Sequence, residues 1–348
     1  MRVTVCVTCS TRAWRENADT DMALLEVENL SVQLQTQRGP AMAVRGVNFH
    51  LERGETLGLI GESGCGKSIT AMALMGLLPD NAVVSGSIRF DQQQLVGQAD
   101  ITLRHLRGNR IGMIFQEPMT ALNPVHSIGD QVTEPLRLHR GASREAAKRQ
   151  AIALLERVGI ADAARRFDAY PHQFSGGQRQ RITIAMALAC EPDLLIADEP
   201  TTALDVTIQG QILDLISELV EERGMALILI SHDLGVIAEN VSRMLVMYGG
   251  TVVESGPTQA VFGQMAHPYT RGLFGARPQL GGARGKRLST IEGTVPELAD
   301  LPLGCPFQER CALASAECAA ALPQPIELGH SHRVSCLHLE LPTGVILP

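Results

Sequence analysis

The sequence predicts an α/β fold with a mostly parallel sheet that is covered by helices on both faces. Short, strongly apolar runs of strand length occur at residues 55–60, 194–197 and 226–230. Helical patterns separate these runs, and strands that alternate with helices are typical of a parallel sheet buried on both faces. Hydrophobic residues make up 45% of the chain and charged residues 19%, which excludes a largely disordered protein.

The chain is expected to divide into a tail, a main domain with an inserted helical subdomain, and an extension. Residues 1–22 are expected to be a disordered tail or a misplaced start, with Met22 as the functional beginning. The α/β domain covers 23–265. Its helical subdomain lies at about 116–175, where 144–158 carries an apolar stripe at helical spacing. Frequent glycine and proline and a group of cysteines mark a separate extension over 266–348.

Charge and hydropathy restrict the class of partner. The chain has 30 Lys and Arg against 37 Asp and Glu, a net charge of −7, so nucleic acid is not an expected partner. No apolar run approaches the ~18 residues that would span a bilayer. If this protein works at a membrane, other chains must cross it.

A glycine-rich loop follows the strand predicted at 55–60, and a helical pattern over 68–78 follows the loop. The loop fits the GxxxxGK[ST] pattern, in which backbone N–H groups and the start of a helix surround phosphate oxygens. Lys67 is predicted to reach the β- and γ-phosphates and Ser68 to bind Mg²⁺, while Cys65 is expected to be a small filler. The predicted ATP-binding residues of the loop are Gly61, Glu62, Ser63, Gly64, Cys65, Gly66, Lys67 and Ser68.

Two adjacent carboxylates end the apolar run at 194–197, where ligands bind in open α/β sheets. Asp198 is predicted to hold Mg²⁺, directly or through water. Glu199 lies just beyond it and is predicted to orient or deprotonate the attacking water. His232 ends the next apolar run and is predicted to hydrogen-bond the γ-phosphate; a purely structural histidine is the alternative.

Six motifs occur in an order that resembles the nucleotide-binding subunit of ABC transporters, over about residues 24–265. The tetrapeptide that follows Phe174 is the most characteristic, since it opens a helix and so offers free N–H groups to an anion. The motifs are the glycine-rich loop, Gln116, the tetrapeptide Ser175-Gly176-Gly177-Gln178, the pair Asp198-Glu199, Ala203-Leu204-Asp205, and His232.

The resemblance implies that two subunits close head to tail around ATP, so that the tetrapeptide of one contacts the γ-phosphate held by the other. It also implies that Gln116 contacts Mg²⁺ and the attacking water, and that Asp205 communicates across the dimer interface. The expected partners are a second ATPase subunit, identical or different, and two transmembrane permeases. The stretch 123–138, with Ile128, Val132 and Leu136, is expected to face a permease, and for each residue a place in the subdomain core is an equal alternative.

The sequence departs from the family at the adenine site. Family members usually stack an aromatic ring on adenine from a strand ahead of the glycine-rich loop, whereas residues 32–36 contain no aromatic residue. Leu34 or Val44 is therefore expected to contact adenine, with less discrimination among purine nucleotides.

Four cysteines of the extension resemble those of ATPase subunits from dipeptide/oligopeptide importers. Four thiolates suit either tetrahedral Zn²⁺ or an iron–sulfur cluster, and their spacing does not choose between them. The resemblance favours a [4Fe–4S] cluster, with Zn²⁺ as the alternative and free thiols as the third possibility. The cysteines are Cys305, Cys311, Cys318 and Cys336, with the spacing C-x5-C-x6-C-x17-C, and His330, His332 and His338 are substitute zinc ligands.

The resemblance implies an ATP-hydrolysing subunit of a bacterial importer of dipeptides or oligopeptides. Such a subunit lies at the cytoplasmic face of the inner membrane, and an extracytoplasmic solute-binding protein serves the complex. Glutathione, a nickel complex or another small solute is the alternative cargo. A soluble ABC-type ATPase acting on nucleic acid or ribosomes is the rival from another class. It is disfavoured because the sequence has no long coiled-coil insert, duplicated ATPase half or basic tract.

Overall fold

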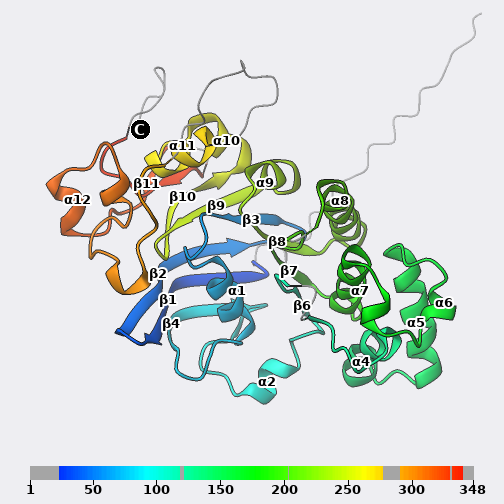
Figure 1. Cartoon of the computed structure of the whole chain (residues 1–348). Coiled ribbons are helices and arrows are strands. Elements are labelled where there is room, and N and C mark those ends of the chain that lie inside the picture. Colours follow the sequence, from blue (N-terminus) through cyan, green and yellow to red (C-terminus); the bar gives the residue numbers. More distant parts are fainter. Residues whose placement is uncertain (1–22, 118–120, 203, 277–290, 330, 340–348) are drawn as a thin grey trace, which may run out of the picture.

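The computed structural model describes residues 23–117, 121–202, 204–276, 291–329 and 331–339, so the expected tail lies outside the described residues. The described residues fold into two β-sheets and a helical lobe (Figure 1). The strands are β1 (Leu25–Thr36), β2 (Gly39–Leu51), β3 (Thr56–Ile60), β4 (Val83–Phe90), β5 (Gln93–Gln94), β6 (Ile111–Ile114), β7 (Leu194–Asp198), β8 (Ala226–Ser231), β9 (Arg243–Tyr248), β10 (Thr251–Pro257), β11 (Ile326–Glu327) and β12 (Arg333–Val334).

At least one helix lies between successive strands of the parallel sheet, and α4 to α7 form the lobe between β6 and β7. The α-helices are α1 (Lys67–Met75), α2 (Asp100–Arg104), α4 (Ile128–Arg140), α5 (Arg144–Arg157), α6 (Ala163–Arg166), α7 (Gly176–Leu188), α8 (Val206–Arg223), α9 (Leu234–Asn240), α10 (Thr258–Gln264), α11 (Pro268–Gly275) and α12 (Ala316–Ala320). Short 3₁₀ turns are η1 (Pro171–Gln173), η2 (Leu298–Asp300) and η3 (Gln308–Arg310).

The predicted parallel sheet is confirmed. An eight-stranded sheet has the order β11-β12-β10-β9-β3-β8-β7-β6, and the five strands from β9 to β6 are parallel. Every residue of β7 and β8 is buried, which explains their continuous apolar sequence. The carboxyl ends of β3, β7 and β8 therefore meet at one edge, where the predicted nucleotide residues follow them.

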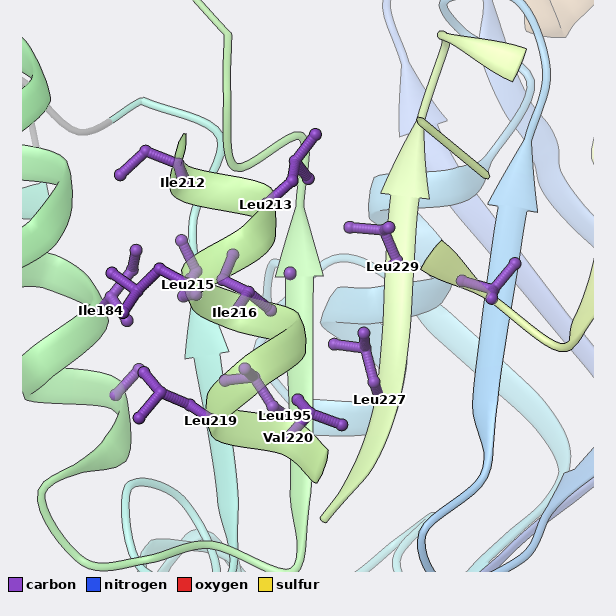
Figure 2. Packing of buried hydrophobic residues seen from close by; sticks show 14 of the residues in the cluster. Ile184, Leu195, Ile212, Leu213, Leu215, Ile216, Leu219, Val220, Leu227 and Leu229 are labelled. Atoms are coloured by element: carbon purple, nitrogen blue, oxygen red, sulfur yellow. The ribbon is translucent and has the colours of Figure 1, made fainter. Parts of the chain in front are cut away.

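Both faces of this sheet are covered. On one face lie α1 and a four-stranded antiparallel sheet of order β2-β1-β4-β5, and the two sheets share one apolar core with α1. On the other face α8 packs against β7 and β8, as Figure 2 shows. Leu215 and Leu219 of α8 lie beside Ile184 of α7, so this core joins the sheet to the helical lobe (Figure 2).

The helical lobe contains α4 to α7, and its predicted helix at 144–158 is confirmed as α5. Ser127 and Ser143 cap α4 and α5 by accepting backbone N–H bonds, which fixes where both helices begin. Ile128, Val132 and Leu136 are only 0%, 0% and 4% exposed. The expectation that they face a permease is thus wrong, because the lobe needs them for its own core.

The C-terminal extension is not a separate unit, because it adds strands to the main sheet. β12 pairs with the antiparallel edge strand β10, and Glu254 lies opposite Val334. Glu254, which is 1% exposed, also accepts hydrogen bonds from the amides of Ala266 and His267 and from His332 Nε2 at 2.8 Å. No helix in the parts of the chain that the structure describes is long and apolar enough to cross a membrane.

Buried His267 makes a pH-dependent contribution to stability. It is 1% exposed, its Nδ1 accepts the amide of Tyr269 at 3.0 Å, and its buried Nε2 has no hydrogen-bond partner in the described parts of the chain. Burial lowers the pKa of His267 to about 4, so the folded chain holds it neutral where the unfolded chain protonates it. Since the unfolded state then binds more protons, stability is complete above pH ~6.5 and falls as the pH drops towards ~4, by on the order of 3 kcal/mol.

The matched variant is His267→Asn, whose side chain still accepts the amide of Tyr269 but does not titrate. Chemical unfolding between pH ~6.5 and ~4 should show a steeper loss of free energy for wild type than for this variant. Parallel curves would contradict the assignment.

Candidate functional site

The glycine-rich loop connects β3 to α1 at the predicted place. A Cβ at Gly61 would lie 2.2 Å from the carbonyl oxygen of Met247, and one at Gly66 would lie 2.7 Å from that of Ala43. Gly66 also has a φ of 101°, which favours glycine. The backbones of β9 and β2 thus lie close against the loop on two sides. Only glycine fits at these two positions, and the loop backbone is held in one path.

Lys67 lies inside the loop and is 5% exposed. Its Nζ donates to the carbonyl oxygens of Gly61 at 2.7 Å and Glu62 at 3.1 Å. Cys65 is fully buried beneath the loop, and burial raises the pKa of its thiol. An uncharged, enclosed thiol agrees with the predicted filler role. Ser63 and Gly64 are exposed at the tip, where a ligand can reach the backbone.

Asp198 ends β7 beside Ser68, the predicted partner in holding Mg²⁺. Burial raises the pKa of Asp198, while a hydrogen bond from Ser68 lowers it, Glu199 raises it and Lys67 lowers it. Its Oδ1 is buried and has no hydrogen-bond partner among the described residues. An orphaned carboxylate oxygen next to a serine hydroxyl supplies the hard oxygen ligands that Mg²⁺ takes, so the residues fit the ion.

Glu199 brings the other predicted catalytic residues together. Its Oε2 accepts Gln116 Nε2 at 3.1 Å and lies 3.4 Å from His232 Nδ1. The hydroxyl of Thr202 donates to the same oxygen at 2.9 Å, a contact that the sequence analysis missed although Thr202 follows three residues later. Glu199 has a φ of 45°, and such strain in a residue other than glycine clusters at functional sites. The carboxylate is therefore held in one orientation.

The predicted tetrapeptide begins α7. Ser175 caps the helix by accepting the amide of Gln178 at 3.4 Å, and the Gln178 side chain accepts the amide of Ser175 at 3.2 Å. Ser175 and Gly176 are exposed, and a Cβ at Gly177 would lie 2.9 Å from Ile208. Asp205 caps α8 by accepting the amide of Ile208 at 3.0 Å. The first turn of a helix carries N–H groups that no carbonyl of the same helix can accept, and such groups can bind an anion.

The two residues proposed for adenine lie on neighbouring antiparallel strands. Val44 on β2 is fully buried and packs beneath Gly66, whereas Leu34 on β1 is half-buried. Of the two, Leu34 offers side-chain surface to a base.

The four cysteines of the extension lie in one neighbourhood. Burial raises the pKa of Cys305 to about 11, and the nearby Cys318, Cys336 and Cys311 raise it as well. Cys305, Cys318 and Cys336 are buried and Cys311 is partly buried, and none forms a disulfide. Within the described stretches, however, no group of three or more His, Cys, Asp or Glu side chains is arranged to hold a metal ion. The predicted metal centre is therefore not confirmed.

Two of the three histidines offered as substitute zinc ligands contact other side chains. His332 pairs with Glu254 at 2.8 Å, and Nε2 of His338 lies 2.8 Å from the hydroxyl of Ser315. His330 lies outside the described residues.

Comparison with known proteins agrees with this geometry. The family profile described as ABC transporter matches residues 44–202, and the profile described as oligopeptide/dipeptide transporter, C-terminal region, matches residues 253–318. The dipeptide transport ATP-binding protein DppD of Bacillus subtilis is 49% identical over 315 residues, which cover 90% of this chain and 94% of that protein. The oligopeptide transport ATP-binding protein OppD of Mycobacterium tuberculosis is 48% identical over 322 residues, which cover 92% of this chain and 53% of that protein.

A solved structure supports the same conclusion. An ATP-binding cassette in a dimeric post-hydrolysis state, bound to ADP and Pi, is similar with a TM-score of 0.60 and 29% sequence identity, covering 67% of this chain and 98% of that chain. The shared fold, the two matching profiles and the assembled residues around Glu199 agree, and the chain belongs to the ATP-binding subunits of ABC transporters, in the dipeptide/oligopeptide importer family.

Proposed function

We propose that this ABC ATPase uses ATP hydrolysis to power the import of dipeptides or oligopeptides. One observation carries the proposal: residues 253–318 match the oligopeptide/dipeptide transporter profile, and β10, at the start of that region, pairs with β9 in the same sheet as the nucleotide site. Relatives that are named for dipeptide and oligopeptide transport support the cargo class. Glutathione, a nickel complex or another small solute is the alternative cargo.

We propose a role for each side chain of the site. Lys67 and the loop amides bind the phosphates, and Ser68 with Asp198 would hold Mg²⁺, which neutralises charge on the phosphate oxygens. Glu199 takes the proton of the attacking water, with its carboxylate oriented by Gln116 and Thr202. His232, which is largely exposed beside Glu199, is placed to donate to the γ-phosphate.

The exposed start of α7 supports an ATP site that is formed by residues of two ATPase subunits. Ser175 and Gly177 would bind the γ-phosphate of ATP held by a second ATPase subunit, and Asp205 would lie near that interface. The dimeric state of the similar solved cassette supports this arrangement. We propose further that two permeases bind this subunit at the cytoplasmic face of the inner membrane, that an extracytoplasmic solute-binding protein delivers the cargo, and that nucleic acid is not a partner.

Reconstitution tests the cargo. The chain would be co-purified with the permeases and the binding protein of its complex and placed in lipid vesicles. We expect a mixture of dipeptides and oligopeptides to stimulate ATP hydrolysis and to accumulate, whereas glutathione and nickel complexes do neither. If glutathione or a nickel complex alone stimulated ATP hydrolysis, that solute would take the place of peptides as the proposed cargo. Co-purification with nucleic acid instead of permeases would overturn the transporter function.

We propose that the four cysteines of the extension bind a [4Fe–4S] cluster, with Zn²⁺ as the alternative. The support is their shared neighbourhood and their burial, which would shield a cluster from water. The side chains would have to rotate towards one another on binding. After anaerobic purification we expect bound iron and visible absorption, both lost in Cys318→Ser and retained in Cys190→Ser, a buried cysteine outside the group. A colourless protein that contains zinc would exclude the cluster and support the zinc site. A protein that contains neither iron nor zinc would exclude both metal sites.

A further inference from the structure

The C-terminal extension reaches the nucleotide loop through Arg310. Its guanidinium forms a two-pronged ion pair with Glu62, the second residue of the loop, with Nη1 2.7 Å from Oε2 and Nη2 3.2 Å from Oε1. The side chain of Arg310 is only 5% exposed and that of Glu62 29%. A bidentate pair between an arginine and a carboxylate that is partly shielded from water fixes geometry as well as charge.

Glu62 is held at two further points. Its amide donates to the hydroxyl of Tyr269 at 2.8 Å, and Tyr269 belongs to α11 and is fully buried. Its carbonyl oxygen accepts Nζ of Lys67 at 3.1 Å. The side chain and the amide of this residue are thus bound by residues from beyond the α/β core. Its carbonyl is bound by the lysine that is expected to hold the phosphates.

Arg310 is itself rigidly placed. Its guanidinium carbon lies 5.7 Å from the centre of the Tyr248 ring and 6.0 Å from that of Phe307, and its Nε donates to the carbonyl of Glu292 at 2.8 Å. The rings of Tyr248, Tyr269 and Phe307 contact one another with centroids 4.6 to 5.3 Å apart. Close packing of these three rings, an aromatic cluster, holds Arg310 of the extension at a fixed distance from the glycine-rich loop.

We propose that Arg310 and Tyr269 are positioning residues for ATP binding, and that the extension completes the nucleotide site through Glu62. A carboxylate beside a triphosphate repels it unless a cation neutralises the carboxylate. Arg310 supplies that cation and turns the Glu62 side chain towards the extension. Tyr269 binds the amide of Glu62 and so fixes the backbone that carries the carbonyl on which Lys67 rests. The inference depends on the ATP binding of the proposed function but not on the cargo.

The test is a double-mutant cycle on the full chain, read as the Kd for ATP and as kcat. We expect Arg310→Gln to raise the Kd about tenfold, because the Glu62 carboxylate is left without its counterion. Glu62→Gln leaves the Arg310 cation without a counterion close to the triphosphate, so it should bind ATP more tightly than wild type. In the double variant Arg310→Gln/Glu62→Gln neither charge remains, so affinity should return to within about twofold of wild type.

Repulsion between the Glu62 carboxylate and ATP also predicts that the effect of Arg310→Gln on the Kd depends on salt. The defect of Arg310→Gln should shrink as salt rises from about 0.05 to 0.5 M, because ions screen the exposed part of the carboxylate. If Arg310→Gln does not fold, Tyr269→Phe provides a second test, because it keeps the ring but loses the hydroxyl that accepts the Glu62 amide. This variant should raise the Kd for ATP with little change in the melting temperature.

A matched control removes a different ion pair between the extension and the rest of the chain. Arg38, beside the β1–β2 turn, binds Asp300 of η2 at 2.5 Å and Glu297 at 3.2 Å, and none of these residues belongs to the nucleotide site. Arg38→Gln should leave the Kd for ATP unchanged. Equal affinity of Arg310→Gln and wild type, or failure of Glu62→Gln to restore the double variant, would overturn the inference. If wild type itself did not bind ATP, the proposed function would fail instead.

Discussion

Glu199→Gln is expected to lower kcat for ATP hydrolysis by ~10²-fold or more while leaving ATP bound. Glutamine keeps the size of the side chain and still accepts from Gln116 and Thr202, whose bonds at 3.1 and 2.9 Å hold the carboxylate. What it loses is the ability to take a proton from water. Phosphate release gives kcat, and equilibrium binding of labelled ATP gives the Kd.

The same variant tests closure of two subunits. Because the γ-phosphate is not cleaved, ATP should hold the subunits together, and size-exclusion chromatography with Mg²⁺ and ATP should show an ATP-dependent dimer. The matched control is Glu222→Gln on the exposed face of α8, which breaks an ion pair with Arg157 at 2.8 Å and should hydrolyse ATP normally. Turnover close to wild type in Glu199→Gln would remove Glu199 from the role of base.

Lys67→Ala is expected to weaken ATP binding by about 10- to 100-fold, the range for losing hydrogen bonds from a charged donor. Lys67 is the buried cation of the loop, and its Nζ already rests on the carbonyl oxygens of Gly61 and Glu62. Phosphate oxygens are stronger acceptors than these carbonyls because they are charged. In contrast to Glu199→Gln, the defect should therefore lie in the Kd for ATP.

Lys148→Ala is the control for this prediction. Lys148 lies on the exposed face of α5, with its Nζ 4.7 Å from the centre of the Phe167 ring, and its removal should leave the Kd for ATP unchanged. The melting temperature of Lys67→Ala should be measured alongside, because the loop carbonyls lose their donor. Equal ATP affinity of Lys67→Ala and wild type would exclude Lys67 as a phosphate ligand.

The sequence was least informative where burial and long-range pairing decide a residue's role. Ile128, Val132 and Leu136 share an apolar stripe that fits a binding face and a core equally well, and only the packing of α4 in the lobe shows them buried. The extension was expected to be separate because its composition changes, whereas the pairing of β12 with β10 joins it to the main sheet. Composition describes a segment by itself and carries no information on what covers it.

By itself the sequence determined the parallel sheet, the glycine-rich loop and the grouping of Asp198, Glu199 and His232, and the family resemblance added Gln116 to this group. Strand periodicity and loop motifs are local, and parallel strands bring their carboxyl ends to one edge without further information. Only the tertiary structure decided that Thr202 orients Glu199 and that Arg310 and Tyr269 hold Glu62. Arg310 and Glu62 are 248 positions apart in the chain, and packing of the aromatic cluster in the assembled fold brings them within hydrogen-bonding distance.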